Sequence, residues 1–320
     1  MNRRILVIGA GGQIGTELIP ALRKEFGESN VVASDLGVTC PDSLAGGPYE
    51  KLDVKDRPGL EVLVSNYKID TIYLMAAMLS ATGEQKPHLA WDLNMNGLFN
   101  VLEIAREKKI KVFWPSSIAV FGPTTPRTET PQFTVCEPTT IYGISKLAGE
   151  HWCAWYHKKY GLDVRSIRYP GLIGHKSAPG GGTTDYAVHI FYEAIRAKHY
   201  TCFLAEHTRL PMMYMDDAIR ATLEITEAPA SKIQLRNGYN LAGFSFTPGE
   251  LASLIREEIP GFTISYTPDF RQDVASSWPE SIDDRIAREH WNWNPRWDLR
   301  AMTSEMLREI SKKTQESATL

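Results

Sequence analysis

A tyrosine and a lysine four residues apart are the pair with the clearest chemical potential in this chain of 320 residues. Tyr142 and Lys146 stand in the run Tyr-Gly-Ile-Ser-Lys, and in a helix their side chains share one face. A cation held beside a phenol favours the phenolate, so Tyr142 could accept a proton well below its reference pKa of about 10. The alternative is a chance spacing on a solvated helix face, and the surrounding sequence decides between the two.

A glycine-rich segment near the N-terminus is a candidate phosphate site. The apolar run 4–8 leads into Gly9, Gly12 and Gly15, and a helix-like sequence follows. Backbone amides and the helix dipole face an anion at such a junction, and glycine lets the anion approach. The spacing differs from the G-x-G-x-x-G fingerprint, whose third glycine would fall on Ile14. A tight turn without a ligand is the alternative, but the position after the first strand favours a dinucleotide.

An acidic residue lies near the end of the second expected strand, 30–36. Asp35 follows Gly15 by twenty residues. A carboxylate there can accept hydrogen bonds from the adenosine ribose hydroxyls and would repel a 2′-phosphate, which favours NAD over NADP. An aspartate that caps a turn is the alternative interpretation.

Strands and helices then alternate as in a doubly wound parallel sheet. Asp53 ends a short third strand, Ala76–Ala77 close a fourth, and Ser116–Ser117 close a fifth. Ligands bind at the carboxyl edge of such a sheet, where these residues would meet. Asn94 lies inside the expected helix after the fourth strand, where asparagine is a poor helix former unless its amide has a partner.

These residues make the chain similar to the extended short-chain dehydrogenases/reductases, the superfamily that includes nucleotide-sugar epimerases. The matching positions are Gly9, Gly12, Gly15, Asp35, Leu52, Asp53, Val54, Ala76, Ala77, Asn94, the run Ser116–Gly122, Tyr142 and Lys146. The resemblance implies that Ser117 and Tyr142 contact the reacting oxygen, while Lys146 holds the nicotinamide ribose and lowers the pKa of Tyr142. One departure is Leu74, where many relatives carry a histidine.

The same resemblance implies NAD as the cofactor. The residues expected to bind it are Gly9, Gly12, Gln13, Ile14, Gly15, Asp35, Leu52, Asp53, Ala76, Ala77, Asn94, Tyr142, Lys146, Tyr169 and Pro170.

Four further runs closely resemble the short-chain type of L-threonine 3-dehydrogenase. They are Met78–Glu84, Pro179–Tyr186, Leu210–Tyr214 and Ser276–Pro279, of which the second is the most specific. The resemblance covers essentially the whole chain. It implies an NAD-dependent oxidation of the 3-hydroxyl of L-threonine to 2-amino-3-oxobutanoate.

A small zwitterion such as threonine needs hydrogen-bond donors for its carboxylate, an acceptor for its ammonium and an apolar wall for its methyl group. The expected substrate contacts are Ser80, Ser117, Tyr142, Thr183, Thr184, Asp185 and Trp278. Ser80 and Thr184 would be carboxylate donors, and Trp278 a lid. The alternatives are a threonine that only caps a helix with Asp185 in its first turn, and a core position for Trp278.

Two rival functions remain. A nucleotide-sugar epimerase or dehydratase of the same superfamily would need a roomy pocket and cations for a second diphosphate, and no cluster of arginines and lysines suits it. A nicotinamide-sensing regulator would not need Ser117, Tyr142 and Lys146 together, because a sensor needs no proton acceptor.

Composition argues against several other classes. The formal net charge of -3 gives no reason to expect a nucleic-acid partner, and no apolar run is long enough to cross a membrane. Met1 and two arginines lead directly into the first strand, so we expect no signal peptide and a cytoplasmic protein. The spacing of the cysteines predicts neither a metal site nor a disulfide framework.

We therefore expect an α/β protein. Residues 1–170, with later segments returning to them, would form a Rossmann doubly wound parallel sheet, and residues 171–320 mainly a smaller C-terminal α+β substrate lobe. Related enzymes pair through two long helices each, here 92–108 and 142–160, so the resemblance implies a homodimer.

Overall fold

A parallel sheet of six strands forms the centre of the computed structural model, which describes residues 3–177 and 180–319. Its strands are β1 (Ile5–Ile8), β2 (Val31–Asp35), β3 (Tyr49–Lys51), β4 (Thr71–Leu74), β5 (Lys111–Phe113) and β7 (Val164–Arg165). They lie in the order β3-β2-β1-β4-β5-β7, and every neighbouring pair is parallel. The order reverses between β1 and β4, and ligands bind beyond the carboxyl ends of the strands at such a point. The predicted Rossmann sheet is confirmed.

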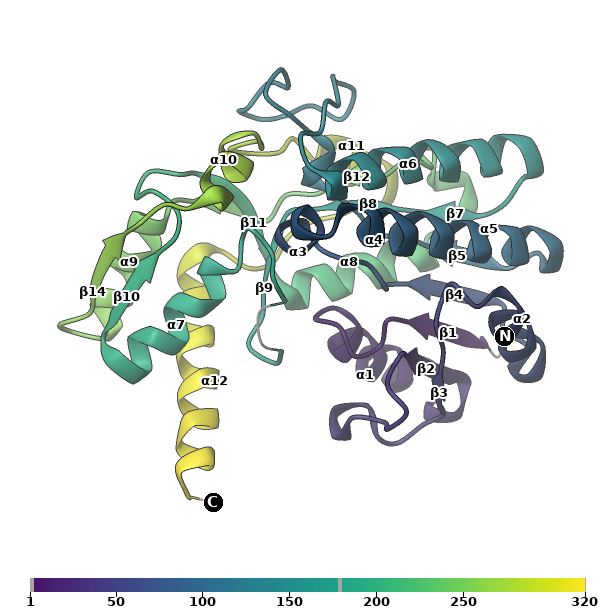
Figure 1. The fold of residues 1–320 in the computed structure, drawn as a ribbon, viewed down its shortest axis with the longest axis horizontal. Helices are drawn as coiled ribbons and strands as arrows, with labels where there is room; N and C mark the ends of the chain where they lie inside the picture. The colour runs from purple at the N-terminus through teal and green to yellow at the C-terminus, as the bar shows by residue number, and fades with distance from the viewer. Residues whose placement is uncertain (1–2, 178–179, 320) are drawn as a thin grey trace.

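Helices cover both faces of this sheet (Figure 1). The helices are α1 (Gly15–Phe26) and α8 (Met215–Glu227) on one face, and α2 (Arg57–Tyr67), α5 (Gly97–Lys108) and α6 (Ile141–Tyr160) on the other. Alternate residues of β1 serve the two faces, because Val7 packs in the core with α1 and Leu6 in the core with α2. Burial on both sides explains why this strand is apolar throughout.

The segment between β4 and α5 is more broken than its sequence pattern indicated. The sequence predicted a loop that enters one long helix. The structure instead contains α3 (Ser80–Gln85), α4 (Pro87–Trp91) and a π-helical turn, η3 (Asp92–Asn96), before α5. Lys86 precedes Pro87 and has a ψ of 60°, because a residue before proline is kept out of the helical region.

The second half of the chain begins with three short strands rather than the single sixth strand that the sequence suggested. After β7, the strand β8 (Ile167–Tyr169) joins β6 (Ser116–Ser117) and β12 (Tyr239–Asn240), and β9 (Gly171–Ile173) joins β11 (Leu210–Tyr214) and β13 (Phe244–Phe246). The expectation of one strand was wrong because the chain changes its pairing partner twice, and Pro170 separates the last two pieces.

A second, smaller lobe has its own apolar core at the carboxyl end of the sheet (Figure 1). It contains α7 (Tyr186–Ala197), β10 (His199–Cys202), α9 (Pro248–Glu258), β14 (Thr263–Tyr266), α10 (Phe270–Ser276) and α12 (Leu299–Thr319). The helices α8 and α11 (Arg285–Trp291) come later than residue 170, yet they pack in the core beside α1. A domain boundary at residue 170 stays a prediction.

None of the helices in residues 3–177 and 180–319 combines the length and the apolar character that crossing a bilayer requires.

Candidate active site

Two adjoining cavities lie along the carboxyl edge of the central sheet. The glycine-loop cavity, of about 380 Å³, is lined by Gly9, Gly11, Gly12, Asp35, Leu52, Asp53, Ala76 and Ala77 among others. The tyrosine cavity, of about 130 Å³, is lined by Gln13, Ile14, Ser80, Ser117, Tyr142, Lys146, Tyr169, Pro170, Thr183, Thr184, Asp185 and Trp278 among others. Met75 and Ala77 line both cavities, which therefore adjoin. Most of the residues singled out from the sequence thus come together on one edge.

The glycine loop leaves backbone donors at the start of α1. Gly9 has a φ of +86°, and a Cβ there would lie 2.4 Å from the amide nitrogen of Ala76, so only glycine lets the two segments approach. Among the residues that the structure describes, the amides of Gln13 and Ile14 donate to no protein acceptor. Both residues line the tyrosine cavity. This loop therefore fits a phosphate group.

Asp35 is held by backbone amides at the end of β2. Its Oδ2 accepts a hydrogen bond from the amide of Gly11 at 2.7 Å, and its Oδ1 accepts one from Leu36 at 2.7 Å. Each carboxylate oxygen can accept a further bond, and the residue lines the glycine-loop cavity. The carboxylate therefore has the capacity that recognition of a ribose requires.

Helix α6 presents Tyr142 and Lys146 to the tyrosine cavity. The helix begins after Thr140, whose Oγ1 accepts a hydrogen bond from the amide of Gly143 at 3.0 Å. Gly143 also allows close packing, because a Cβ there would lie 2.1 Å from the carbonyl oxygen of Ala119. The first turn of α6 is thereby pressed against the turn that follows Ser117.

The Lys146 side chain is almost fully buried, with 3% of its surface exposed. Its Nζ donates to the carbonyl oxygen of Pro115 at 2.6 Å. The ammonium lies 4.6 Å from the ring centre of Trp114 and 5.5 Å from that of Tyr142. Lys146 thus lies over the Tyr142 ring from the next helical turn, as its spacing predicted.

Burial sets the titration of both groups. It lowers the pKa of Lys146 to about 7, although Cys153 and Glu150 partly oppose this effect. It raises the pKa of Tyr142 to about 12, which a hydrogen bond with Ser117 offsets only in part. The predicted downward shift of the Tyr142 pKa is therefore wrong for this structure. Desolvation of the phenolate is the larger cause, and it outweighs the hydrogen bond with Ser117.

Ser117 ends β6 and begins a short 3-10 turn, η4 (Ile118–Val120). Its Oγ accepts a hydrogen bond from the amide of Ala119 at 3.2 Å, which fixes the hydroxyl at the start of the turn. Ser117, Tyr142 and Lys146 therefore meet in one cavity, although the first is separated from the other two by an irregular loop.

Ser80 of α3 and polar residues just before α7 also line this cavity. The hydroxyl oxygens of Ser80 and Thr183 are 3.1 Å apart and both side chains are buried. Asp185 Oδ2 accepts hydrogen bonds from the amides of Gly181 at 2.9 Å and Gly182 at 2.8 Å, and burial raises the pKa of this carboxyl. Asp185 thus stabilises the turn formed by the glycines that precede it. Pro179, the first residue of the run singled out from the sequence, lies outside the described residues.

Trp278 lines the cavity and also belongs to the core of the second lobe, with 5% of its surface exposed. Its neighbours are tied to the irregular loop that precedes α6. Arg127 Nη1 donates to the carbonyl oxygen of Ser276 at 2.7 Å, and the amide of Glu280 donates to the Arg127 carbonyl at 2.7 Å. This contact could not be predicted from the sequence, because the loop has no periodic pattern.

Three expected cofactor residues have other neighbours. Gly15 begins α1, lines neither cavity and packs against the backbone of Gly9. Asn94 also lines neither cavity. Its side chain pairs with the backbone of Met78, accepting at 2.9 Å and donating at 3.2 Å, and also donates to Ser145 at 3.2 Å. Tyr169 lines the tyrosine cavity, but its hydroxyl bonds with Thr222 on α8.

The sequence did not single out the apolar part of the wall. Met75, Leu79, Ile118 and Leu172 also line the tyrosine cavity. Their residue type is the same as that of core residues, so no signal in the sequence distinguishes them.

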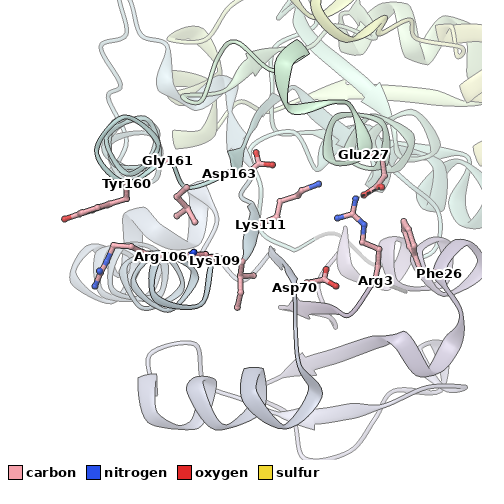
Figure 2. Close-up of a pocket in the computed structure, with 12 residues that line it drawn as sticks. Arg3, Phe26, Asp70, Arg106, Lys109, Lys111, Tyr160, Gly161, Asp163 and Glu227 are labelled. Carbon is pink, nitrogen blue, oxygen red and sulfur yellow. Dashed lines mark hydrogen bonds and ion pairs between the residues drawn. The ribbon is translucent and has the colours of Figure 1, made fainter. Parts of the chain in front are cut away.

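A larger cavity of about 860 Å³ lies at the opposite, amino-terminal edge of the sheet (Figure 2). Several of its charged groups have partners within the protein. Arg3 pairs with Glu227 at 2.9 Å, and Arg106 pairs with Glu103 at 2.8 Å. None of the residues predicted for the site lines this cavity. We therefore assign the candidate active site to the carboxyl edge.

Comparison with known proteins places these features in a family. The sequence profile described as "NAD dependent epimerase/dehydratase family" matches residues 5–242. An uncharacterized epimerase/dehydratase of Staphylococcus haemolyticus is 49% identical over 314 residues, which cover 98% of this chain and 99% of the relative. One of Staphylococcus aureus is 49% identical over 313 residues, with 97% and 98% covered.

Solved structures of similar proteins carry more specific names. The GalE-like L-threonine dehydrogenase from Cupriavidus necator, in its holo form, is 56% identical, with a TM-score of 0.94 and coverage of 96% of this chain and 99% of that one. L-threonine dehydrogenase from Clostridium difficile is 47% identical, with a TM-score of 0.95 and coverage of 97% and 98%. UDP-glucose 4-epimerase from Thermotoga maritima is 21% identical, has a TM-score of 0.85, and shares the fold. The chain therefore belongs to the NAD dependent epimerase/dehydratase family of extended short-chain dehydrogenases/reductases.

Proposed function

We propose that this protein is an NAD-dependent L-threonine 3-dehydrogenase, which oxidises the 3-hydroxyl of L-threonine to 2-amino-3-oxobutanoate. The observation that carries the proposal is the tyrosine cavity. It joins the proton-handling residues Ser117 and Tyr142 to the buried hydroxyls of Ser80 and Thr183 within about 130 Å³. That volume lies below the range of about 300–1,000 Å³ typical of pockets for larger ligands, and it suits a small amino acid.

The names of the similar solved structures agree with this substrate. Those described as L-threonine dehydrogenases are as much as 56% identical to this chain over nearly its whole length. The UDP-glucose 4-epimerase is 21% identical, so its likeness supports the fold and not the substrate.

NAD would place its adenosine end in the glycine-loop cavity and extend into the adjoining tyrosine cavity, which Gln13, Ile14 and Lys146 line. The amides of Gln13 and Ile14 would bind the pyrophosphate, and Asp35 would bind the adenosine ribose and disfavour a 2′-phosphate. Lys146 would hold the nicotinamide ribose. A bound nicotinamide supplies the acceptor for the hydride that leaves the substrate carbon.

In the proposed reaction the protein supplies the path of the proton. Tyr142, as phenolate, would take the proton of the substrate 3-hydroxyl, while Ser117 would orient that oxygen. Because burial raises the pKa of Tyr142 to about 12, the phenolate needs a nearby positive charge, which Lys146 would provide.

The substrate's polar groups would contact other residues that line the tyrosine cavity. Ser80, Thr183 and Thr184 offer hydroxyl donors for the carboxylate, and Trp278 offers an apolar surface for the methyl group. Asp185 would act chiefly by shaping the loop, since it accepts two amides of that loop.

Steady formation of NADH from free NAD and L-threonine tests the proposal. The absorbance of NADH should rise with L-threonine and stay flat with UDP-glucose. An epimerase would convert a UDP-sugar without net reduction of free NAD, and that outcome would replace the proposal. Tight NAD binding without turnover of any alcohol would instead support a sensor.

We also propose that two copies pair through α5 and α6. Trp152, Trp155 and Tyr160 of α6 are 39%, 43% and 45% exposed, which is unusual for large aromatic side chains. Trp152 stacks edge-on against Phe99 of α5 with ring centres 4.8 Å apart, so the two helices share one aromatic face. A similar L-threonine 3-dehydrogenase structure is described as monomeric, so the assembly state needs its own measurement. A cytoplasmic location stays a prediction.

A further inference from the structure

We propose that the buried ion pair between Glu150 and Arg168 is a positioning element, which holds residues 115–117 in register with the reactive face of α6. The inference rests on the proposed dehydrogenase function. It concerns two residues that line neither of the two cavities.

The pair is fully enclosed and geometrically specific. Glu150 lies on α6 with 1% of its surface exposed, and Arg168 lies on β8 with 3% exposed. Arg168 Nε donates to Glu150 Oε1 at 2.8 Å, and its Nη2 donates to Oε2 at 2.8 Å. A bidentate bond of this kind fixes the orientation of both groups. A buried ion pair is weak evidence for stability, so its geometric effect is the more informative property.

The third partner of Glu150 connects the pair to the candidate active site. Ser116 Oγ donates to Glu150 Oε1 at 2.6 Å. Ser116 stands between Pro115, whose carbonyl accepts from Lys146 at 2.6 Å, and Ser117, whose side chain hydrogen-bonds with Tyr142.

Three consecutive residues are therefore joined to three residues spaced four apart on one helix. Ser117 meets Tyr142, Pro115 meets Lys146, and Ser116 meets Glu150. Residues four apart share a helix face, so these bonds form a ladder between the chain after β5 and α6. Glu150 and Arg168 anchor its far end. A shift of that end would move the Ser117 hydroxyl and the Lys146 ammonium relative to Tyr142.

Arg168 in turn ties the ladder to distant segments. Its Nη1 donates to the Gln132 carbonyl at 3.2 Å and to Asn240 Oδ1 at 3.2 Å. Its guanidinium also lies 5.2 Å from the ring centre of Phe121. The pair thus joins α6, β6, β8, β12 and the loop before α6 at one point.

The charge of Glu150 also affects the pKa of Lys146. Three groups of α6 face the Lys146 ammonium, namely Tyr142, Glu150 and Cys153. The Trp114 ring and the Pro115 carbonyl face it from the segment after β5. Arg168 of β8 lies behind Glu150. Burial lowers the pKa of Lys146 to about 7, and the Glu150 carboxylate limits that fall. Loss of the carboxylate should make Lys146 lose its proton at a lower pH.

Arg165 offers a matched control, because it is also a buried arginine, three residues earlier in the chain and 2% exposed. It pairs with Asp163 at 3.0 Å and donates to the carbonyls of Ile225 and Ala228 at the end of α8, each at 2.6 Å. Within the part of the chain that the structure describes, it forms no hydrogen bond or ion pair with residues 115–117. Its substitution should reduce stability without disturbing the ladder.

The experiment compares Glu150→Gln, Arg168→Lys and Ser116→Ala with Arg165→Lys. For each full-length variant, Tm, NAD affinity, and kcat and KM for L-threonine are measured from about pH 6 to about pH 10, well below every Tm. Nitrogen-15 NMR of the lysine ammonium groups, with Lys146→Met for assignment, follows the Lys146 titration without any need for turnover.

We expect both arginine variants to lower Tm. Only Glu150→Gln and Arg168→Lys should lower kcat, by about tenfold to a hundredfold, with KM and NAD affinity nearly unchanged, as displacement of a reacting group by about 1 Å would do. Ser116→Ala should lower kcat by a smaller factor. In Glu150→Gln, Lys146 should titrate at a lower pH, and the rising limb of kcat/KM should move with it to a lower pH.

Wild-type kcat and an unchanged Lys146 titration in Arg168→Lys and Glu150→Gln would overturn the inference and leave the pair a structural one. An equal loss of kcat in Arg165→Lys would overturn it too. If Glu150→Gln does not fold, Arg168→Lys and Ser116→Ala decide by the same criteria. A wild type that binds NAD but does not oxidise L-threonine contradicts the proposed function only, because the NMR titration still tests the ladder.

Discussion

Tyr142 and Lys146 are buried together, and burial drives both toward their neutral forms. The pKa of the phenol rises to about 12 and that of the amine falls to about 7. Each charged form would stabilise the other, because a phenolate and an ammonium at close range attract in a low-dielectric site. The proposed chemistry therefore depends on the two residues being charged at the same time.

Replacement of Tyr142 by phenylalanine removes the proposed proton acceptor and little else. We expect kcat for L-threonine to fall by about 10²–10⁴-fold, the range attributed to a positioned acid or base, while NAD affinity stays nearly the same. Steady-state NADH formation and titration of protein fluorescence with NAD measure the two quantities. Normal turnover by the variant would show that another group accepts the proton.

The rate should also depend on pH in a definite direction. The active form needs a Tyr142 phenolate beside a charged Lys146, so kcat/KM should rise with pH up to the Lys146 pKa of about 7 and level off above it. Lys146→Met removes the cation that supports the phenolate, so the rising limb should move to higher pH and the rate at neutral pH should fall. A pH profile of the variant that coincides with the wild-type profile would argue against that support.

Asp35 should set the preference between NAD and NADP. In Asp35→Ser we expect kcat/KM for NAD to fall by about tenfold and the preference over NADP to shrink, because the ribose acceptor and the charge facing a 2′-phosphate are both lost. Asp53→Asn is the control, since it removes a charge from the same cavity. If both variants change the NAD/NADP ratio equally, the discrimination comes from overall charge and not from Asp35.

At the level of residues, the sequence predicted which side chains lie together, but it did not predict the direction in which the pKa of Tyr142 shifts. Ser117, Tyr142 and Lys146 do line one cavity. Their proximity follows from the spacing of Tyr142 and Lys146 on a helix and from the position of Ser117 at the end of a strand. The pKa of Tyr142 depends instead on how much water the surrounding segments exclude, and those segments come from distant parts of the chain.

Among the elements, the irregular loop before α6 has the least obvious role. It contains Arg127, which holds the backbone on both sides of Trp278 through Ser276 and Glu280. Thr139, at the other end of the loop, lies 3.2 Å from the Ser277 hydroxyl. The loop therefore connects the start of α6 to the wall of the tyrosine cavity.

Truncation of Arg127 should loosen that wall. We expect Arg127→Ala to raise KM for L-threonine several-fold without a change in NAD affinity, because the backbone beside Trp278 loses an anchor while the glycine-loop cavity is untouched. Arg285→Ala is the control. Arg285 is likewise an exposed arginine in an ion pair, with Asp283 where Arg127 has Glu280, but it does not bond to the residues beside Trp278. Equal KM values for both variants would contradict the role of the loop.

The doubly wound parallel sheet was predictable from the alternation of strand-like and helix-like segments, whereas strand breaks were not. The run 162–174 was expected to form one strand, yet it forms β7, β8 and β9. Those strands pair with β5, β6 and β11 respectively. Partner choice depends on where distant segments lie, which local periodicity does not encode. The π-helical turn at Asn94 was not predicted from the sequence for a similar reason, because Met78, which hydrogen-bonds to Asn94, lies outside the helix.

On the scale of the whole molecule, one short segment joins the two lobes near both cavities. Lys176 pairs with Glu17 of α1 at 3.0 Å, and the Ser177 hydroxyl lies 2.7 Å from that of Thr16. Lys313 of α12 donates to the carbonyl of His175 at 2.6 Å. The helix that follows the glycine loop is thus linked to the last helix of the chain. A change at either cavity has a direct physical connection to the packing between the lobes.

Helices α5 and α6 extend away from the second lobe (Figure 1), and none of Phe99, Trp152, Trp155 and Tyr160 lines the tyrosine cavity, so pairing through these side chains would leave the lining of that cavity in place. We expect sedimentation velocity to show a dimer at micromolar concentration and Trp155→Arg to shift it toward monomer, because a charge would be buried at the centre of the contact. Phe133→Arg is the control, since Phe133 is 71% exposed on the loop before α6. Substrate turnover per chain should persist in the monomer, because both cavities are built from residues of one chain. A wild type that sediments as a monomer would refute the pairing and leave the proposed reaction intact.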